Sequence, residues 1–411
     1  MFVLKRFQAS RLERLNTVVS GVHRHLTQYI NLVGSATLPL PEVCEAISLP
    51  GSAIRTEGHL GSRFFPGTKP IDDAELIAME GVKRLFEIFD GYQVSVQPHS
   101  ATQANHIVWN SLLDQGDKVL GLSLNDGGHL SHTLGLPKGI TFLPFPMGDS
   151  GIAYSELKKM VIETKPKMLV AGATSYTLAI DYVRLASIAK ITNSYLHADI
   201  AHTAPYVFSG QHPNVIPGAD TITLDTGKNL RGPKGGVLVY RTNHEKKIKR
   251  SIFPLVQSSL NQSAIIAKAC LFEYWDRTNI KDHAIELIRT SKYFAEYLKT
   301  YGVPLIFEGT DTHLILMDVG KLGLSGKEAE ERLEKYNILS NRNTIPGDSR
   351  PAWIGSGLRI GTTVLTILGY SNEDLRVLAR IISEILNLNT PPKNCIELLL
   401  KKYHSSVSVL V

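Results

Sequence analysis

The sequence predicts an α/β fold with a largely parallel sheet, arranged as a large domain followed by a smaller C-terminal α/β domain. The chain has 411 residues, more than one average domain, and its 43% hydrophobic content supplies material for a sizeable core. Between about 70 and 240, short apolar runs alternate with helix-like segments, the pattern of a sheet covered by helices. We therefore expect an N-terminal helical arm over 1–40, a large domain over 41–275 and a small domain over 276–411.

The individual elements follow from apolar periodicity. Five short apolar or β-branched runs predict buried strands: Lys118–Leu122, Lys167–Ala171, Tyr195–Ala198, Thr221–Leu224 and Gly236–Tyr240. Helical spacing predicts helices over Ala74–Asp90, Tyr154–Thr164 and Leu185–Asn193. Toward the C-terminus we expect a long helix around 261–300, a strand at His313–Val319, a polar loop at Asn341–Arg350 and a final helix from Asn372 to about Leu388. Because such sheets bind ligands beyond the carboxyl ends of their strands, polar residues there are the first candidates for a site.

The charge is mildly basic, with a formal net charge of +6 and a pI near 9.0. This balance suits anionic small molecules such as phosphates and carboxylates. The densest basic cluster, at 246–250, has no interleaved aromatic residues, so we expect a solvated helix face and no nucleic-acid partner.

The cysteines and the apolar runs bear on compartment. Cys44, Cys270 and Cys395 are far apart and lack metal-ligand spacing, which predicts neither a disulfide framework nor a metal site and fits the reducing cytoplasm. The N-terminal segment is better explained as an amphipathic helix than as a transit peptide. No apolar run reaches the ~18 residues that a membrane helix needs, so no membrane partner is expected.

Lys228 is the sharpest local feature, in the segment TGKNLRGPKGG (226–236). A lysine placed just after a strand and before a Gly-Pro turn can be buried in a pocket. Burial would lower its pKa and populate the amine that attacks an aldehyde. A surface lysine beside a turn is the alternative when the segment is considered alone.

Two further segments suit parts of a phosphorylated aromatic aldehyde. Asp199 closes a predicted strand in the segment DIAH (199–202), where a carboxylate could pair with a pyridinium nitrogen or simply cap a helix. The segment QPHSATQAN (97–105) leads small hydroxyl residues into a helix. Its N–H groups could bind a phosphate, or the segment could be an ordinary capping turn.

His129 and Arg359 complete the set of candidate residues. His129 follows a glycine pair and could lie flat against a planar cofactor, or it could be an ordinary loop histidine. Arg359 lies in the glycine-rich segment GSGLRIGT (355–362). Its planar guanidinium suits two-point binding of a carboxylate, and a structural salt bridge is the alternative.

Taken together, these segments resemble the serine hydroxymethyltransferase family of fold-type I pyridoxal-phosphate enzymes. The matching stretches are TEGHLGSRFFPG (56–67), QPHSATQAN (97–105), GGHLSH (127–132), DIAH (199–202), TGKNLRGPKGG (226–236) and GSGLRIGT (355–362), and the resemblance covers about 30–385. It implies a large pyridoxal-phosphate domain with a mostly parallel sheet of the seven-stranded type. It also implies an enzyme that cleaves or forms the Cα–Cβ bond of serine, glycine or a related β-hydroxy amino acid through a glycine quinonoid.

The resemblance also assigns roles to individual residues. Lys228 would hold pyridoxal 5'-phosphate as a Schiff base, Asp199 would pair with its ring nitrogen, and His129 would stack on the ring. The remaining assignments are His202 and Thr174 near the ring hydroxyl, Ser100, Ala101 and Thr102 at the phosphate, Arg359 with Ser35 at the substrate carboxylate, Phe65 at the substrate, and Glu57 in proton transfer at the substrate hydroxyl. Because the family forms homodimers with shared sites, Arg55, Glu57 and Gln257 are expected to come from the neighbouring subunit.

The chain departs from the family pattern where folate and the substrate side chain would bind. The departures are Arg55 for a tyrosine, Phe64 and Phe65 for two tyrosines, Gly227 for a histidine, Gly347 for an asparagine, Ser35-Ala-Thr37 for the usual acid and asparagine, and a 255–260 loop that keeps only Gln257. Leu124 and Leu130 do match leucines of the folate pocket. Three alternatives therefore stay open: tetrahydrofolate-dependent transfer, folate-independent threonine aldolase or transaldolase chemistry, and hydroxymethyl transfer to an α-substituted amino acid. Another pyridoxal-phosphate reaction and a non-catalytic partner protein fit the retained residues less well.

Overall fold

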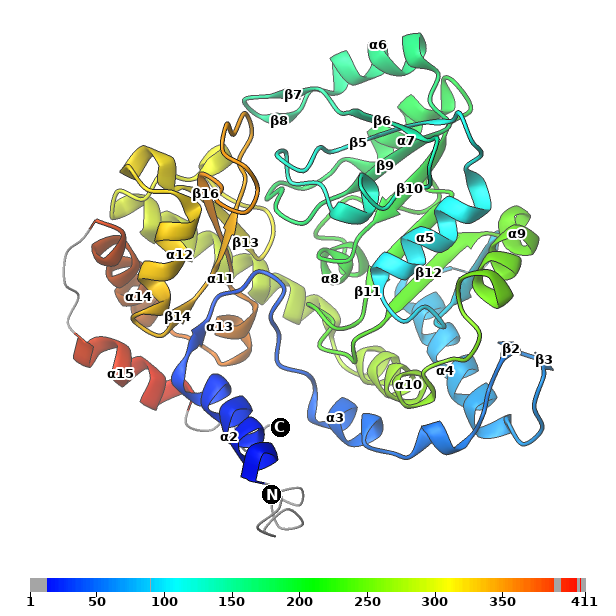
Figure 1. The fold of residues 1–411 in the computed structure, drawn as a ribbon, viewed down its shortest axis with the longest axis horizontal. Helices are drawn as coiled ribbons and strands as arrows, with labels where there is room; N and C mark the ends of the chain where they lie inside the picture. Colours follow the sequence, from blue (N-terminus) through cyan, green and yellow to red (C-terminus); the bar gives the residue numbers. More distant parts are fainter. Residues whose placement is uncertain (1–12, 89, 388–392, 405–406, 408–411) are drawn as a thin grey trace.

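The computed structural model describes residues 13–88, 90–387, 393–404 and 407. A seven-stranded sheet forms the centre of the larger part, in the order β4-β12-β11-β10-β9-β5-β6 (Figure 1). Its strands are β4 (Tyr92–Ser95), β5 (Lys118–Gly121), β6 (Thr141–Pro144), β9 (Met168–Gly172), β10 (Tyr195–Asp199), β11 (Thr221–Asp225) and β12 (Gly236–Arg241). β12 runs in the opposite direction to the other six strands. The predicted α/β fold with a mostly parallel sheet is confirmed.

Helices cover both faces of this sheet. They are α4 (Lys69–Leu85), α5 (Ala101–Leu112), α6 (Tyr154–Thr164), α7 (Tyr182–Lys190), α8 (Ala204–Phe208), α9 (Glu245–Arg250) and α10 (Gln262–Arg277). Successive residues of β9 enter different cores: Leu169 packs with the cluster that includes α4 and α10, and Val170 packs with the cluster around α5. Burial on both faces explains why the sheet strands are nearly continuous apolar runs in the sequence.

The smaller part is built on an antiparallel sheet in the order β13-β16-β15. Its strands are β13 (Leu314–Asp318), β15 (Asn341–Asn343) and β16 (Gly357–Gly361), and its helices include α11 (Ile280–Thr300), α12 (Gly326–Glu334), α13 (Thr363–Ile367), α14 (Asn372–Leu386) and α15 (Lys393–Tyr403). The glycine-rich segment of Arg359 is thus a buried central strand.

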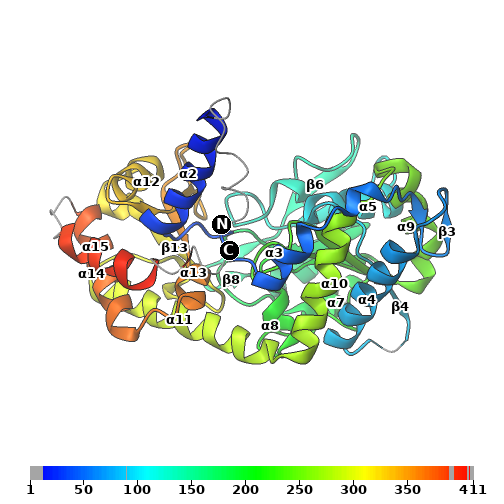
Figure 2. The ribbon, with the colours of Figure 1, turned by 90° about the horizontal axis from the view of Figure 1, so that it is seen from below.

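The N-terminal segment lies along both parts. Helix α2 (Glu13–Gln28) leads into β1 (Ile30–Asn31), which pairs with β14 (Ile338–Leu339) in the smaller part. The chain then crosses to the larger part, where α3 (Pro41–Ile47) packs on α10, and Figure 2 shows α3, α10 and α4 along one face. Residues 1–12 of the expected arm lie outside the described residues, and the expected domain boundaries at 40 and 275 stay predictions.

The sequence-based prediction of one long helix around 261–300 is wrong. Two helices, α10 and α11, occupy this region because Thr278 is extended and Asn279 starts α11 by accepting the backbone N–H of Lys281 at 3.0 Å. The polar loop expected at Asn341–Arg350 likewise begins with strand β15. Within the described residues, no helix combines the length and hydrophobicity needed to cross a membrane.

Candidate active site

One group of the residues predicted from the sequence gathers at one edge of the large sheet, where its parallel strands end. Strands β4, β5, β9, β10 and β11 point their carboxyl ends the same way, and the polar residues that end or follow them are brought to this edge. These residues are Ser100 after β4, His129 after β5, Thr174 after β9, Asp199 at the end of β10 and Lys228 after β11. Arg359 reaches the same place from β16 of the smaller part, where it hydrogen-bonds Thr174.

Lys228 is largely buried at this edge, with 17% of its side chain exposed. Burial lowers the pKa of its amine, while the carboxylates of Asp225 and Asp199 act in the opposite direction and the charge of Arg359 lowers it further. A lysine whose ammonium form is destabilised in this way is suited to attack a carbonyl carbon. The alternative of an exposed turn lysine does not describe this side chain.

Asp199 has a buried carboxylate that is held in place by three donors. Its Oδ1 accepts the backbone N–H of Ala201 at 3.0 Å, and its Oδ2 accepts from Asn105 at 2.8 Å and lies 2.9 Å from Nε2 of His132. Burial by itself would raise the pKa of Asp199, but the hydrogen bond and charge of His132 outweigh it and hold the pKa below its ordinary value. Asp199 is therefore an ionised carboxylate in a dry site, ready to pair with a cationic group.

A buried polar network behind Asp199 was not predicted from the sequence. Asn105 also contacts Nε2 of His197 through its Oδ1 at 3.0 Å, and Thr221 lies 2.8 Å from Nδ1 of the same ring. Because an amide oxygen only accepts, Nε2 of His197 carries the proton. Burial lowers the pKa of His197 to about 3, in keeping with this neutral ring. His197 and Asp199 are two residues apart on one strand, so their side chains share a face of the sheet. This spacing could have indicated from the sequence that both belong to one polar network.

Arg359 carries a buried positive charge without an acidic partner. Its guanidinium, in a residue 8% exposed, donates to the backbone oxygen of Thr174 at 2.5 Å, to the Thr174 hydroxyl at 2.9 Å, and to Oδ1 of Asn341 at 3.0 and 3.1 Å. No carboxylate of the described residues lies within salt-bridge distance of it. Burial lowers its pKa to about 10, which still leaves it cationic at neutral pH. The arrangement favours an anionic ligand over the alternative of a structural salt bridge.

The N-terminal segment approaches Arg359 closely at Gly34. A β carbon at this position would lie 2.8 Å from Nε of Arg359, so only glycine fits without displacing the guanidinium. Ser35, the next residue, has an exposed side chain, and its predicted role at the substrate carboxylate stays a prediction.

The start of α5 offers N–H groups to an anion. Ser100 caps this helix, with its Oγ accepting the N–H of Gln103 at 3.1 Å, and the N–H groups of Ala101 and Thr102 occupy the first turn, where helix geometry provides no acceptor. Gly236 packs against this turn, where a β carbon would meet the backbone oxygen of Ser100 at 2.3 Å. The helix dipole adds positive potential, so the site suits a phosphate.

Lys268 supports this turn from behind and was not singled out from the sequence. It is 1% exposed and donates to three backbone oxygens, those of Val96 at 2.5 Å, Gly236 at 2.8 Å and Pro98 at 3.0 Å. Three acceptors require three protons, so the hydrogen bonds favour the ammonium form. Burial acts against this form and lowers the pKa of Lys268 to about 7.

Replacing Lys268 by methionine should destabilise the fold. The substitution keeps the aliphatic volume but removes the ammonium that donates to three buried backbone oxygens, of which that of Pro98 still accepts the N–H of Gly236. We therefore expect the free energy of unfolding to fall by about 3 kcal/mol. Urea denaturation measures this, with Lys247→Met on the exposed face of α9 as a control that should change little. Equal midpoints for the two variants would show that Lys268 does not hold the turn.

His129 and His202 both lie at the site as neutral rings. Burial lowers the pKa of His129 to about 4, and its Nδ1 accepts the N–H of Ser131 at 3.2 Å. Burial also lowers the pKa of His202 well below its usual value. His202 stacks on His313, which directly precedes β13 and whose Nε2 donates to the backbone oxygen of Gly34 at 3.1 Å. His313, which the sequence analysis missed, thus joins the two sheets and the N-terminal segment at this point.

Another group of predicted residues lies elsewhere. Arg55, Glu57, Phe65 and Gln257 belong to the hairpin of β2 (Gly58–His59) and β3 (Ser62–Arg63) and to the loop beside it, where Glu57 forms a β-bridge with Ser259. Figure 1 shows this hairpin beyond α4, on the side away from β13 and β16. Within the described chain, no hydrogen bond or ion pair joins these four residues to Lys228, Asp199 or Arg359. Both polar atoms of the Gln257 side chain are buried without a partner.

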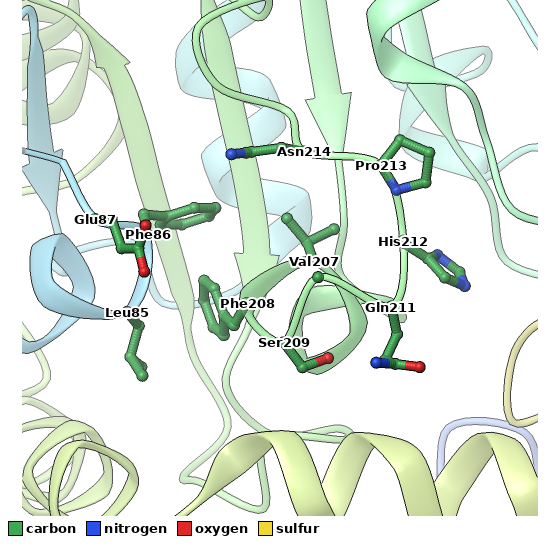
Figure 3. A pocket seen from close by; sticks show the side chains of 11 residues that line it. Leu85, Phe86, Glu87, Val207, Phe208, Ser209, Gln211, His212, Pro213 and Asn214 are labelled. Carbon is green, nitrogen blue, oxygen red and sulfur yellow. The ribbon is translucent and has the colours of Figure 1, made fainter.

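A separate cavity of about 550 Å³ lies at the end of α4 and the loop after α8 (Figure 3). Its lining residues are Leu85, Phe86, Glu87, Val207, Phe208, Ser209, Gly210, Gln211, His212, Pro213 and Asn214. The imidazole of His212 contacts the backbone oxygen of Asp311 at 2.8 Å and packs on Tyr206. The site residues predicted from the sequence do not line this cavity. We therefore place the candidate active site at the edge of the large sheet.

The chain is similar to known proteins over most of its length. The family model described as serine hydroxymethyltransferase matches residues 11–382. The chain is 36% identical over 363 residues to a serine hydroxymethyltransferase of Bordetella avium, covering 87% of this chain and 86% of that protein. It is 35% identical over 394 residues to one of an Acidovorax species, covering 95% and 94%. It is also 38% identical over 368 residues to a 2-methylserine hydroxymethyltransferase of a Paracoccus species, covering 87% and 85%.

Proposed function

The chain belongs to the serine hydroxymethyltransferase family, and from that premise we propose that it transfers a hydroxymethyl group to and from the α carbon of a small amino acid, with pyridoxal phosphate held on Lys228. The observation that carries the proposal is the meeting of Lys228, Asp199 and Arg359 at one sheet edge. An amine, a buried carboxylate and a buried guanidinium are the groups that an aldehyde cofactor and an amino-acid substrate together require.

The residues at this edge fit pyridoxal phosphate in their chemistry. The amine of Lys228 matches the aldehyde, the carboxylate of Asp199 matches the ring nitrogen, and the start of α5 matches the phosphate. Thr223, the register partner of Asp199 on β11, adds a buried hydroxyl that has no hydrogen-bond partner among the described residues. An unpartnered polar atom at this place supports the presence of a polar ligand.

The residues at this edge would have separate roles in the reaction. Bound pyridoxal phosphate supplies an electron sink that stabilises negative charge on the substrate's α carbon. Asp199, kept ionised by His132, would hold a proton on the ring nitrogen. Arg359 would bind the substrate carboxylate and so orient the bond to be broken, while the neutral ring of His129 would lie against the cofactor. Lys228 would exchange protons with the substrate after its amine is released.

A second subunit would complete the site. Phe64 is 71% exposed and packs on Phe253, and Phe65 is also exposed. In the loop after Phe253, both polar atoms of the Gln257 side chain are buried without a partner among the described residues. Exposed aromatic residues and buried polar atoms without a partner each support an interface. In a homodimer this hairpin would bring Arg55 and Glu57 to the neighbouring Lys228, with Glu57 exchanging the proton of the substrate hydroxyl.

The substrate has two candidates within one chemistry. Serine and glycine follow from the family, and the similarity to the Paracoccus 2-methylserine hydroxymethyltransferase favours an amino acid with a methyl group on the α carbon. Serine and 2-methylserine would each lose one formaldehyde equivalent from Cα, which leaves glycine and alanine respectively. The departures from the family pattern at Phe64, Phe65 and Gly227 lie in residues expected to shape this choice.

The substrate is tested by incubating the purified protein with serine, 2-methylserine and threonine, each with and without tetrahydrofolate. We expect glycine from serine or alanine from 2-methylserine, formed faster when tetrahydrofolate accepts the one-carbon unit, as product chromatography would measure. Cleavage of threonine at a rate that does not depend on tetrahydrofolate would indicate aldolase chemistry in place of hydroxymethyl transfer. Release of ammonia or carbon dioxide, with no loss of the hydroxymethyl group, would overturn the proposed function.

A further inference from the structure

Asp225 lies beside the reactive lysine. It ends β11, three residues before Lys228, and its Oδ2 is 3.8 Å from the lysine Nζ. Its other oxygen, Oδ1, accepts the N–H of Gly227 at 2.8 Å. One oxygen therefore anchors the side chain to the turn, and the other remains free to face the amine.

The surroundings make Asp225 the nearest compensating charge for that amine. Both side chains are mostly buried, with 18% of Asp225 and 17% of Lys228 exposed. The charged and titratable groups that act on this pair from neighbouring elements are Asp199, Arg359, Lys268, His129, His202 and His313. The carboxylate of Asp199 is already bonded to Asn105 and faces His132, whereas Oδ2 of Asp225 has Lys228 as its charged neighbour.

We propose that Asp225 is a positioning residue whose carboxylate acts as the counter-ion of Lys228, stabilising positive charge on Nζ both in the cofactor-free protein and in the cofactor-bound state. This inference rests on the proposed function only for the identity of the bound group. The charge pairing itself concerns the chain's own residues and exists before any cofactor binds.

The two groups influence each other's protonation. Burial lowers the pKa of Lys228, and the Asp225 carboxylate is the largest influence that raises it. Burial likewise raises the pKa of Asp225, and the charge of Lys228 opposes this. Neutralising Asp225 therefore lets the pKa of Lys228 fall further, so more of the lysine is a free amine at neutral pH.

Asp225→Asn separates this role from that of holding the turn. An asparagine oxygen can still accept the N–H of Gly227, so the variant removes the charge and keeps the anchor. In the cofactor-free protein at pH 7.5, we expect Lys228 of Asp225→Asn to react with acetic anhydride about tenfold faster, as peptide mass spectrometry measures. The rate rises because a larger fraction of Lys228 is the neutral amine, the form that reacts, once the charge of Asp225 is removed.

Controls make the result specific. Asp220→Asn changes a carboxylate just before the other end of β11, where Oδ2 accepts the N–H of Leu196, and should leave the rate at Lys228 unchanged. Asp225→Glu keeps the charge and should behave like the wild type. Asp225→Ser serves as a second neutral variant if Asp225→Asn does not fold. Equal labelling rates for the wild type and the neutral variants would overturn the inference.

A second measurement separates this inference from the proposed function. The visible absorbance of protein loaded with pyridoxal phosphate, titrated with alkali, should change at a lower pH in Asp225→Asn than in the wild type. If borohydride fixes no cofactor to wild-type Lys228, the proposed function fails, and the anhydride labelling still tests the charge pair. If cofactor attaches but neither measurement changes, only the role of Asp225 is wrong.

Discussion

Replacing Lys228 by alanine is expected to lower hydroxymethyl transfer by about a thousandfold or more. The substitution removes both the amine that would hold the cofactor and the group that would exchange protons with the substrate. The Lys228 side chain is mostly buried at the carboxyl end of β11. Among the described residues, no other lysine forms an ion pair with Asp225, so no second amine would take its place. Initial rates with saturating pyridoxal phosphate give the loss, and mass spectrometry after borohydride treatment reports whether cofactor remains attached.

Lys234 provides the matched control for this experiment. It lies six residues further on in the same segment, with an exposed side chain, so Lys234→Ala should retain near wild-type activity and cofactor attachment. Covalent attachment in Lys228→Ala, or attachment mapped to another lysine of the wild type, would contradict the assignment.

Replacing Arg359 by glutamine is expected to lower kcat/KM for the amino acid by about two to three orders of magnitude. The guanidinium is buried among neutral acceptors, and its positive charge would be matched only by a substrate carboxylate. Losing one partner of a buried, hydrogen-bonded charge pair costs about 3 to 4 kcal/mol, which corresponds to this range. Steady-state kinetics should show the effect mainly as a higher KM, and cofactor attachment to Lys228 should persist.

Arg342 on the neighbouring strand β15 distinguishes substrate binding from stability. Its guanidinium pairs with Glu330 at 3.2 Å near the surface, so Arg342→Gln should leave KM almost unchanged. Arg359→Lys should recover only part of the activity, because an ammonium cannot make the paired hydrogen bonds of a guanidinium. An unchanged KM in Arg359→Gln, with folding intact by denaturation, would exclude the carboxylate role.

Local patterns in the sequence were sufficient to predict an element where the apolar periodicity of a single segment defines it. Runs such as Thr221–Leu224 predicted strands that the structure extends by one residue. The helix over Tyr154–Thr164 has the predicted bounds. Local patterns failed at Asn279, where a single capping side chain divides one apolar periodicity into two helices.

The sequence by itself determined the α/β fold, the family and the set of residues that gather at the sheet edge, because strand periodicity and short motifs are local properties of a chain. Only the tertiary structure decided which charges compensate one another there. Asp225 faces Lys228, His132 contacts Asp199, and Arg359 finds hydrogen-bond acceptors but no carboxylate. These pairings depend on through-space distance and on the water that burial removes, and a linear sequence records neither.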